Sequence, residues 1–294
     1  MSTSLHAAIE PQFQPIDGIS IRYAESDKRD HEEHAILLCP WPESLYAFAP
    51  AWPRLSDHAH LIAVDLPGFG HSERNDALMS PSAMGEFIIR IADAFELEQP
   101  HIVGPDVGTP AALFAAARHP NRLRSVVVGA GGTAFPLDLG PPLRDWIEAP
   151  DLEPYRRADS REILARIINN FERYRPSSEV RKDYMLSYEG SRFVESMRYV
   201  RAYPADLPVL GDLLPHLEIP VQIIAGKRDE AVPISNAQYL QALLPVSRLD
   251  VLDAGHFAWE DAANQYAAVV TAWWSGIYRE TAEAWRRSRP GQSR

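Results

Sequence analysis

Short apolar runs rich in β-branched residues alternate along the chain with segments that have the spacing of amphipathic helices. The apolar runs predict strands at Ile19–Tyr23, Ala35–Cys39, Leu61–Asp65, His101–Pro105, Ser125–Gly129, Val221–Ala225 and Arg248–Leu252. Between them, residues 81–95 carry apolar side chains at helical spacing behind a proline in the first turn. Such alternation is typical of an α/β fold, in which helices cover both faces of a mostly parallel sheet.

The alternation stops after Gly132. Residues 135–208 are rich in Pro, Tyr, Arg and acidic residues and have a helical pattern but no strand pattern, and strands resume at Val221. A segment of this length between two strands of one sheet is typical of an inserted helical lid. We therefore expect a first core part (residues 1–134), a helical lid or cap insertion (135–208) and a second core part (209–294).

The most informative motif is Gly104-Pro105-Asp106-Val107-Gly108, which follows an apolar strand and precedes a helix of small residues. Flanking glycines allow a sharp strand-to-helix turn that presents the central side chain at the edge of the sheet. In the related pattern G-x-S-x-G the central residue is a nucleophilic serine, whereas here it is Asp106. A carboxylate needs no base to attack carbon and leaves an ester on the enzyme, which predicts alkyl rather than acyl transfer.

Two further residues fit the second half of such a reaction. His256 follows the last predicted strand and Asp229 follows the strand before it, so both belong to loops at the carboxyl edge of the sheet. A histidine there can take a proton from the water that hydrolyses the ester, and a carboxylate can fix its tautomer. Asp138 is the alternative acid, and capping of the following helix is the alternative role for Asp229.

From Ile19 to about Tyr278 the chain resembles the α/β-hydrolase superfamily, in the branch of epoxide hydrolases and haloalkane dehalogenases that have an aspartate nucleophile. The resemblance rests on the turn at Asp106, on the order nucleophile, acid, histidine, and on three further motifs: residues 65–72 (DLPGFGHS), 226–233 (GKRDEAVP) and 254–257 (AGHF). It implies an Asp106-His256-Asp229 triad that works without a cofactor, and no metal-ligand cluster is visible in the sequence.

The sequence departs from this family at one loop. Where members carry His-Gly-x-Pro, this chain reads Cys39-Pro40-Trp41-Pro42. The resemblance implies that the backbone N–H groups of Trp41 and Val107 form an oxyanion hole, and the change removes neither of them. The change affects the loop geometry instead, because the additional proline fixes φ where a glycine is free. Whether the Trp41-Pro42 bond is cis is left open.

The lid and the loops suggest more than one substrate class. Epoxide hydrolases use lid tyrosines as acids, and Tyr199 lies one position away from the family's Tyr-Arg pair, so an epoxide is the first expectation, with packing as the alternative role of Tyr199. Haloalkane dehalogenases carry a tryptophan directly after the nucleophile, where this chain has Val107, so that Trp41 is the candidate donor for a halide. A cofactor-free oxygenase or lyase with His256 as base and a ligand-binding pseudoenzyme are further alternatives.

Charge and composition limit the kinds of partner that the chain is expected to bind. The net charge of −11 argues against a nucleic-acid surface, and no apolar run approaches the ~20 residues of a membrane span. Residues 1–6 lack the pattern of a signal peptide, and the single cysteine, Cys39, excludes an internal disulfide. We expect a cytoplasmic enzyme for a small organic molecule, with a homodimer as one assembly and with a frayed basic end at residues 286–294.

Overall fold

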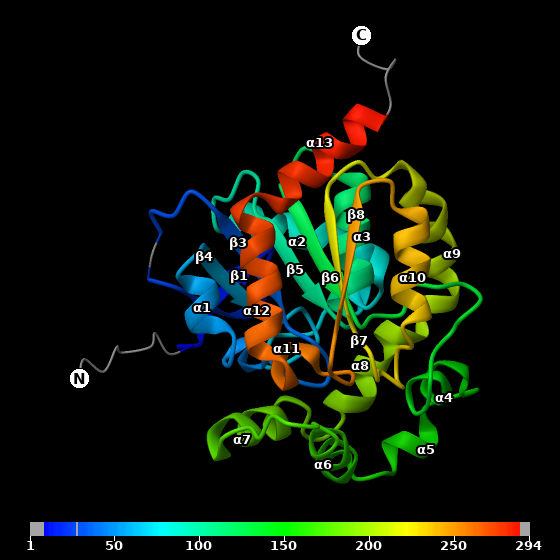
Figure 1. The fold of residues 1–294 in the computed structure, drawn as a ribbon. Helices are drawn as coiled ribbons and strands as arrows, with labels where there is room; N and C mark the ends of the chain where they lie inside the picture. The colour runs from blue at the N-terminus through cyan, green and yellow to red at the C-terminus, as the bar shows by residue number, and fades with distance from the viewer. Residues whose placement is uncertain (1–8, 28, 289–294) are drawn as a thin grey trace.

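A computed structural model describes residues 9–27 and 29–288. Its strands form one sheet in the order β1-β2-β4-β3-β5-β6-β7-β8. The strands are β1 (Gln12–Ile16), β2 (Ile19–Glu25), β3 (His34–Leu38), β4 (His60–Val64), β5 (His101–Pro105), β6 (Ser125–Gly129), β7 (Val221–Gly226) and β8 (Ser247–Leu252). β2 is antiparallel to its two neighbours and all other neighbours are parallel, which confirms the predicted α/β fold (Figure 1).

Helices follow most of the strands. The α-helices are α1 (Trp52–Ser56), α2 (Pro81–Ala94), α3 (Gly108–Arg118), α4 (Leu143–Glu148), α5 (Glu153–Arg156), α6 (Ser160–Asn169), α7 (Ser178–Ser187), α8 (Arg192–Arg201), α9 (Tyr203–Leu213), α10 (Ser235–Leu243), α11 (Ala258–Asp261), α12 (Ala263–Ala272) and α13 (Tyr278–Ser288). Three short 3₁₀ turns, η1 (Leu45–Phe48), η2 (Asp76–Leu78) and η3 (Leu214–His216), and one π-helical turn, η4 (Trp273–Ile277), complete the described elements.

The central strands contribute side chains to a hydrophobic core on each face of the sheet, because successive side chains of a strand point to opposite faces. On β3, Ile36 and Leu38 belong to the core that includes α2 and α3, whereas Ala35 and Leu37 belong to the core that includes α1 and α12. All four side chains are fully buried. The sheet is therefore packed on both faces next to the carboxyl edge that carries the candidate site.

The strand β1 was not predicted. Most of its side chains are exposed, as at Gln12 and Phe13, and it contains Pro15, so the segment has no apolar run that would mark a strand. It pairs only with β2, at the edge of the sheet, where a proline is tolerated.

The segment between β6 and β7 consists of helices and the loops that join them. Residues 130–220, all of them described, contain α4 to α9 and η3 and no strand. Most of these helices lie beyond the carboxyl ends of the central strands, below the sheet in Figure 1. α9 continues through residue 208, where the predicted lid ends. The division of the chain into core and lid parts remains a prediction.

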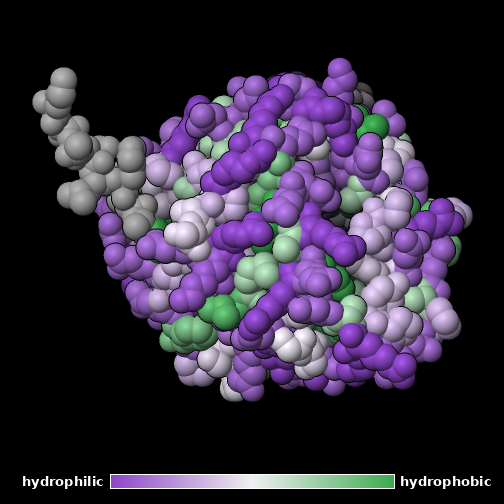
Figure 2. All heavy atoms as spheres, turned by 90° about the horizontal axis from the view of Figure 1, so that it is seen from below, coloured by the Kyte–Doolittle hydropathy of each residue, from purple (hydrophilic) through white to green (hydrophobic). Residues whose placement is uncertain are grey.

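The lid turns its apolar side chains inward. Leu164 of α6 and Phe193 and Met197 of α8 are fully buried. Viewed from the lid side, the surface is mostly hydrophilic, with hydrophobic residues in patches between the polar ones (Figure 2). Within the described part of the chain, no helix is long and apolar enough to cross a membrane. Residues 1–6 and 289–294, which the expectations about both chain ends concern, lie outside the described residues.

Candidate active site

Asp106 stands on a tight turn between β5 and α3. Its backbone φ of +51° is in the left-handed region, as expected for the central residue of this turn. A β-carbon on Gly104 would lie 2.7 Å from the carbonyl oxygen of Gly108, so only glycine allows strand and helix to approach this closely. The turn is fixed further by Thr109, whose hydroxyl bonds the carbonyl groups of Gly104 and Gly129, each at 2.9 Å.

The carboxylate of Asp106 lies among hydrogen-bond donors. The backbone N–H of Trp41 donates to Asp106 Oδ2 at 2.6 Å, and the adjacent N–H of Val107 also stabilises the charged carboxylate and lowers its pKa. The Trp41-Pro42 peptide bond of this loop is cis. The two predicted oxyanion donors therefore face the predicted nucleophile, although Cys39-Pro40 replaces the family's His-Gly. Burial raises the pKa of Asp106 to about 6, which leaves the group mostly ionised at neutral pH.

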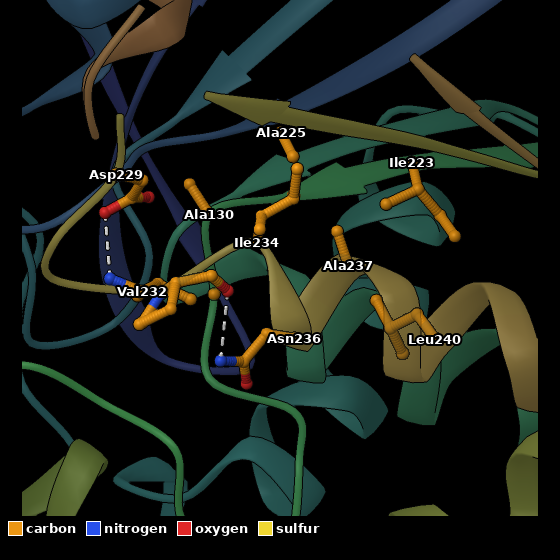
Figure 3. A pocket seen from close by; sticks show the side chains of 12 residues that line it. Ala130, Ile223, Ala225, Asp229, Val232, Ile234, Asn236, Ala237 and Leu240 are labelled. Carbon is orange, nitrogen blue, oxygen red and sulfur yellow. Dashed lines mark hydrogen bonds between the residues drawn. The ribbon is translucent and has the colours of Figure 1, made fainter. Parts of the chain in front are cut away.

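His256 lies between the two aspartates. Its Nδ1 is 2.9 Å from Asp229 Oδ2, and its Nε2 is 3.8 Å from Asp106 Oδ1. The other oxygen of Asp229 accepts the backbone N–H groups of Ala231 at 3.0 Å and Val232 at 2.8 Å, the second of which is drawn in Figure 3. Asp229 thus both orders its own loop and orients the imidazole. The alternative acid, Asp138, accepts a hydrogen bond from Ser235 instead.

The charges of the site favour a protonated imidazole. Burial alone would lower the pKa of His256, but the negative charges of Asp229, Asp106 and Glu43 raise it to about 9. At neutral pH the free site is therefore an ion pair of an imidazolium and the Asp106 carboxylate. Removing the charge of Asp106 would remove one of the three interactions that hold this proton.

The site opens into a cavity of about 750 Å³. Asp106, Trp41 and His256 line it from the core, and Leu143, Trp146 and Ile167 line it from the lid. A second space, of about 10 Å³, lies behind the Asp229 loop and has room for about one water molecule (Figure 3). In residues 9–27 and 29–288 no three His, Cys, Asp or Glu side chains are grouped to hold a metal ion. The large cavity has the size and apolar lid of a small-molecule site.

A sequence profile of the alpha/beta hydrolase fold matches residues 35–263. The chain belongs to the alpha/beta hydrolase fold family. It is 28% identical to a haloalkane dehalogenase of Bradyrhizobium diazoefficiens over 92% of this chain and 95% of that one. It is also 28% identical to a 2-hydroxymuconate semialdehyde hydrolase of Pseudomonas sp. strain CF600 over 74% of this chain and 77% of that one.

Solved structures agree on the fold. The enol-lactonase from Burkholderia xenovorans LB400 is 18% identical and superposes with a TM-score of 0.74 over 90% of this chain and all of that one (100%). A likeness at this level of identity shows the fold alone. The superfamily predicted from the motifs is thus confirmed, whereas the epoxide hydrolase branch and the roles of the site residues remain predictions.

Tyr199 of this hydrolase-fold chain does not line the cavity. It is fully buried, and its hydroxyl donates to the carbonyl oxygen of Val107 at 2.8 Å. Its edge also contacts the ring of Phe69, with centroids 5.3 Å apart. Among the described residues that line the cavity there is no tyrosine. In this structure the Tyr199 hydroxyl is thus bonded to the backbone after Asp106, which favours the packing role, and the role of Tyr199 as an acid remains a prediction.

The indole N–H of Trp41 is also occupied. It donates to the hydroxyl of Ser196 in α8 at 2.8 Å, so Trp41 contributes its backbone N–H to the site but offers no free side-chain donor. Sequence reasoning missed Trp146, which packs edge-on against Trp41 with centroids 5.3 Å apart and lines the cavity from α4. Nothing in the local sequence separates Trp146 from the other tryptophans.

Proposed function

We propose that this protein hydrolyses a bond between saturated carbon and a leaving group through an ester on Asp106. The observation that carries the proposal is the position of one buried carboxylate, which accepts the Trp41 N–H at 2.6 Å and lies 3.8 Å from His256 Nε2 in a large cavity. A serine at this position would attack carbonyl carbon, whereas a carboxylate attacks saturated carbon because its ester with an alkyl group is stable until water is activated.

In the first step an oxygen of Asp106 attacks the substrate carbon, and the leaving group departs with the electron pair of the broken bond. Asp106 becomes a neutral ester and can no longer favour the imidazolium. The pKa of His256 then falls from about 9, and His256 releases its proton to become a base.

In the second step His256 Nε2 removes a proton from water, and the resulting hydroxide attacks the ester carbonyl. Negative charge develops on the carbonyl oxygen, where the N–H groups of Trp41 and Val107 stabilise it. The alcohol product leaves, and Asp106 is restored as a carboxylate that contains one oxygen atom from water. Asp229 holds the imidazole through Nδ1 in both steps.

The lid favours a halide over an epoxide as the group to be displaced. Opening an epoxide requires an acid for the ring oxygen, and no tyrosine lines the cavity within the described residues. A halide needs only an N–H donor, and Trp146, which lines the cavity from the lid, carries one. The relation to a haloalkane dehalogenase along 92% of the chain supports the same choice. We therefore propose a small haloalkane as substrate, with an epoxide as the second candidate.

The proposal is tested by trapping the ester. A His256→Gln protein is incubated with matched sets of haloalkanes and epoxides, followed by intact-mass measurement, peptide mapping and halide assay. A haloalkane should add only its alkyl group, on Asp106, with release of one halide per chain, whereas an epoxide would add its whole mass. The double variant Asp106→Asn, His256→Gln is the control and should add nothing. A folded His256→Gln protein that gains no mass from either set would refute the proposal.

A further inference from the structure

Two buried glutamates lie together behind the candidate site. Glu43 belongs to the loop that carries the Trp41 N–H, and Glu260 lies in α11, directly after His256 in the chain. Their exposed fractions are 1% and 4%. An ionised carboxylate is costly to bury without a cation or several donors, so two neighbouring ones require an explanation.

Neighbouring side chains donate hydrogen bonds to only one carboxyl oxygen of each glutamate. Glu43 Oε1 accepts the indole N–H of Trp259 at 3.1 Å, and Glu260 Oε1 accepts the hydroxyl of Tyr184 at 2.9 Å. The remaining oxygen of each side chain, Oε2, receives no N–H or O–H group from the described residues. The two carboxyl groups interact with each other. Because carboxylate oxygens only accept, a hydrogen bond between them requires one proton between the two groups.

The charges around the pair favour such a proton. Burial raises the pKa of Glu43 to about 7, although its interactions with Glu260 and Trp259 lower it. Burial and the interaction with Glu43 together raise the pKa of Glu260 well above its ordinary value. The other titratable groups that face the two glutamates are Cys39, Asp106, Tyr174, Tyr184, His256 and Asp261. His256 is the only one of them that carries a positive charge.

The pair is connected to His256 through Trp259. The indole ring of Trp259 contacts the imidazole of His256 edge-on, with centroids 5.7 Å apart, while its N–H is bonded to Glu43. The backbone carbonyl of Glu43 also accepts the hydroxyl of Tyr188 from the lid at 3.0 Å. The pair thus contacts three segments that form the site: the loop that carries the Trp41 N–H, the segment after His256, and the lid.

We propose that Glu43 and Glu260 share one proton, and that the single negative charge left on the pair, with its hydrogen bond to Trp259, positions His256 and favours its imidazolium form during ester hydrolysis. The last part rests on the proposed function, because it concerns the step in which His256 takes a proton from water. The shared proton itself does not depend on that function. Glu43 and Glu260 are positioning residues, since they act on substrate only through His256 and the loop.

The experiment first looks for the proton. Infrared spectra at mildly alkaline pH, where Asp106 is ionised, should show a protonated carboxyl band in the parent protein. The band should disappear in both Glu43→Gln and Glu260→Gln, because each amide can donate to the remaining carboxylate in place of the proton. A parent spectrum without this band would overturn the proposal, and needs no variant to fold.

The second measurement follows the titration of His256 by NMR in the resting protein. The double variant Glu43→Gln, Glu260→Gln has lost the negative charge, so the pKa of His256 should fall by about one unit. Glu260→Gln, which keeps a carboxylate on Glu43, should shift it much less. Glu33→Gln is the control, because Glu33 is a half-buried glutamate at the opposite end of the strands. This variant should leave the pKa of His256 unchanged. Equal titrations in the parent and the double variant would overturn the proposal.

Neither measurement uses substrate, so the outcomes for the pair and for the hydrolase proposal are independent. If the ester is trapped, a third readout separates positioning from a general structural effect. In single-turnover experiments the double variant should keep its rate of ester formation within about threefold, whereas the pH profile of ester hydrolysis should move to lower pH by the same shift as His256. A uniform loss of both steps at every pH would contradict the positioning role.

Discussion

At the scale of the residue, the site depends on a balance of charge at Asp106. Burial makes this carboxylate harder to ionise, while the Trp41 and Val107 N–H groups and His256 stabilise its anion. The resulting pKa of about 6 keeps Asp106 anionic at neutral pH without pairing it so tightly that it cannot attack. The same residue must also occupy a left-handed backbone conformation. Asparagine is the substitution best suited to test charge apart from geometry, because it tolerates that conformation.

Asp106→Asn should abolish ester formation and leave the fold intact. The folded-state pKa of about 6 lies above the ordinary 3.8, so the protonated form favours folding and this contribution is lost as pH rises through 6. A neutral amide avoids that loss, so the melting temperature at neutral pH should stay equal or rise. In the parent, the single-turnover rate of ester formation should decline as pH falls below about 6. Turnover by Asp106→Asn at the parent rate would exclude Asp106 as nucleophile.

Trp146→Phe should slow departure of a halide. Phenylalanine keeps an aromatic ring against Trp41 but removes the indole N–H, and losing one donor to developing negative charge costs about 100-fold in favourable sites. Stopped-flow measurement of halide release should show a decrease of about 10-fold to 100-fold, with hydrolysis of the ester unchanged. Trp285→Phe, in α13, is a matched control outside the cavity. Unchanged halide release would assign the leaving group to another donor.

At the scale of the element, the parts that could be predicted are those whose signal is local. The turn at Asp106 needs Gly104 because a β-carbon there would meet the carbonyl oxygen of Gly108, four residues later. The positions of Asp229 and His256 follow from strands that end at one edge of a sheet. The direction of the Tyr199 hydroxyl depends instead on how α8 lies against the turn at Val107, which no local pattern encodes. The lid was predicted as helical, but the residue it presents to the cavity was not.

One contact between lid and core is an ion pair of the buried Arg22 with the partly buried Asp183. Asp183 of α7 bonds the guanidinium of Arg22 in β2 at 3.1 and 2.6 Å, and it also accepts the hydroxyl of Ser44 at 2.6 Å. Burial alone would raise the pKa of Asp183, but hydrogen bonds from His71, Arg22 and Ser44 lower it to about 2. This depressed pKa means that the contact stabilises the fold above pH 3.8 and that the stabilisation is lost as pH falls toward 2.

Asp183→Asn should therefore lower the free energy of unfolding at neutral pH by about 1–3 kcal/mol, since Arg22 keeps Asp65 as a second partner at 3.3 Å. The difference between parent and variant should shrink as the pH of the denaturation experiment is lowered below about 4. Asp253→Asn, which removes an exposed carboxylate paired with Arg173 and Arg228, should change stability little. If Asp183→Asn were as stable as the parent, this ion pair would not hold the lid to the core.

At the scale of the whole molecule, similar side chains have different roles at the two ends of the parallel strands. At the end opposite the site, His101 Nδ1 lies 2.7 Å from the hydroxyl of Ser125, and its Nε2 lies 3.0 Å from Glu33. These are the residue types of a serine, histidine and acid triad. Ser125 and His101 are, however, fully buried, and the hydroxyl also accepts the indole N–H of Trp273 at 2.8 Å. No substrate can reach this serine, so the arrangement holds structure together.

Glu33 connects this buried cluster to the rest of the molecule. It pairs with Arg124 and, at 2.8 Å, with Arg279 of α13, so it attaches the last described helix to the sheet. Burial alone would raise the pKa of Glu33, but His101 and Arg124 lower it to about 2, and its stabilising effect is therefore present above pH 4.5 and lost below it. Glu33→Gln should lower the free energy of unfolding at neutral pH by about 1–3 kcal/mol, as measured by chemical denaturation.

The same variant should leave ester formation and hydrolysis at their parent rates, because Glu33 directly precedes β3, whereas Asp106 and His256 follow the carboxyl ends of β5 and β8. His256→Gln should show the reverse, with little loss of stability and a stalled ester. Opposite effects of these two variants are expected when a sheet has its catalytic residues at the carboxyl ends of the strands and its structural clusters at the amino ends. If Glu33→Gln slowed hydrolysis of the ester while the protein stayed folded, the two ends of the strands would be coupled, and the independence of site and scaffold would be wrong.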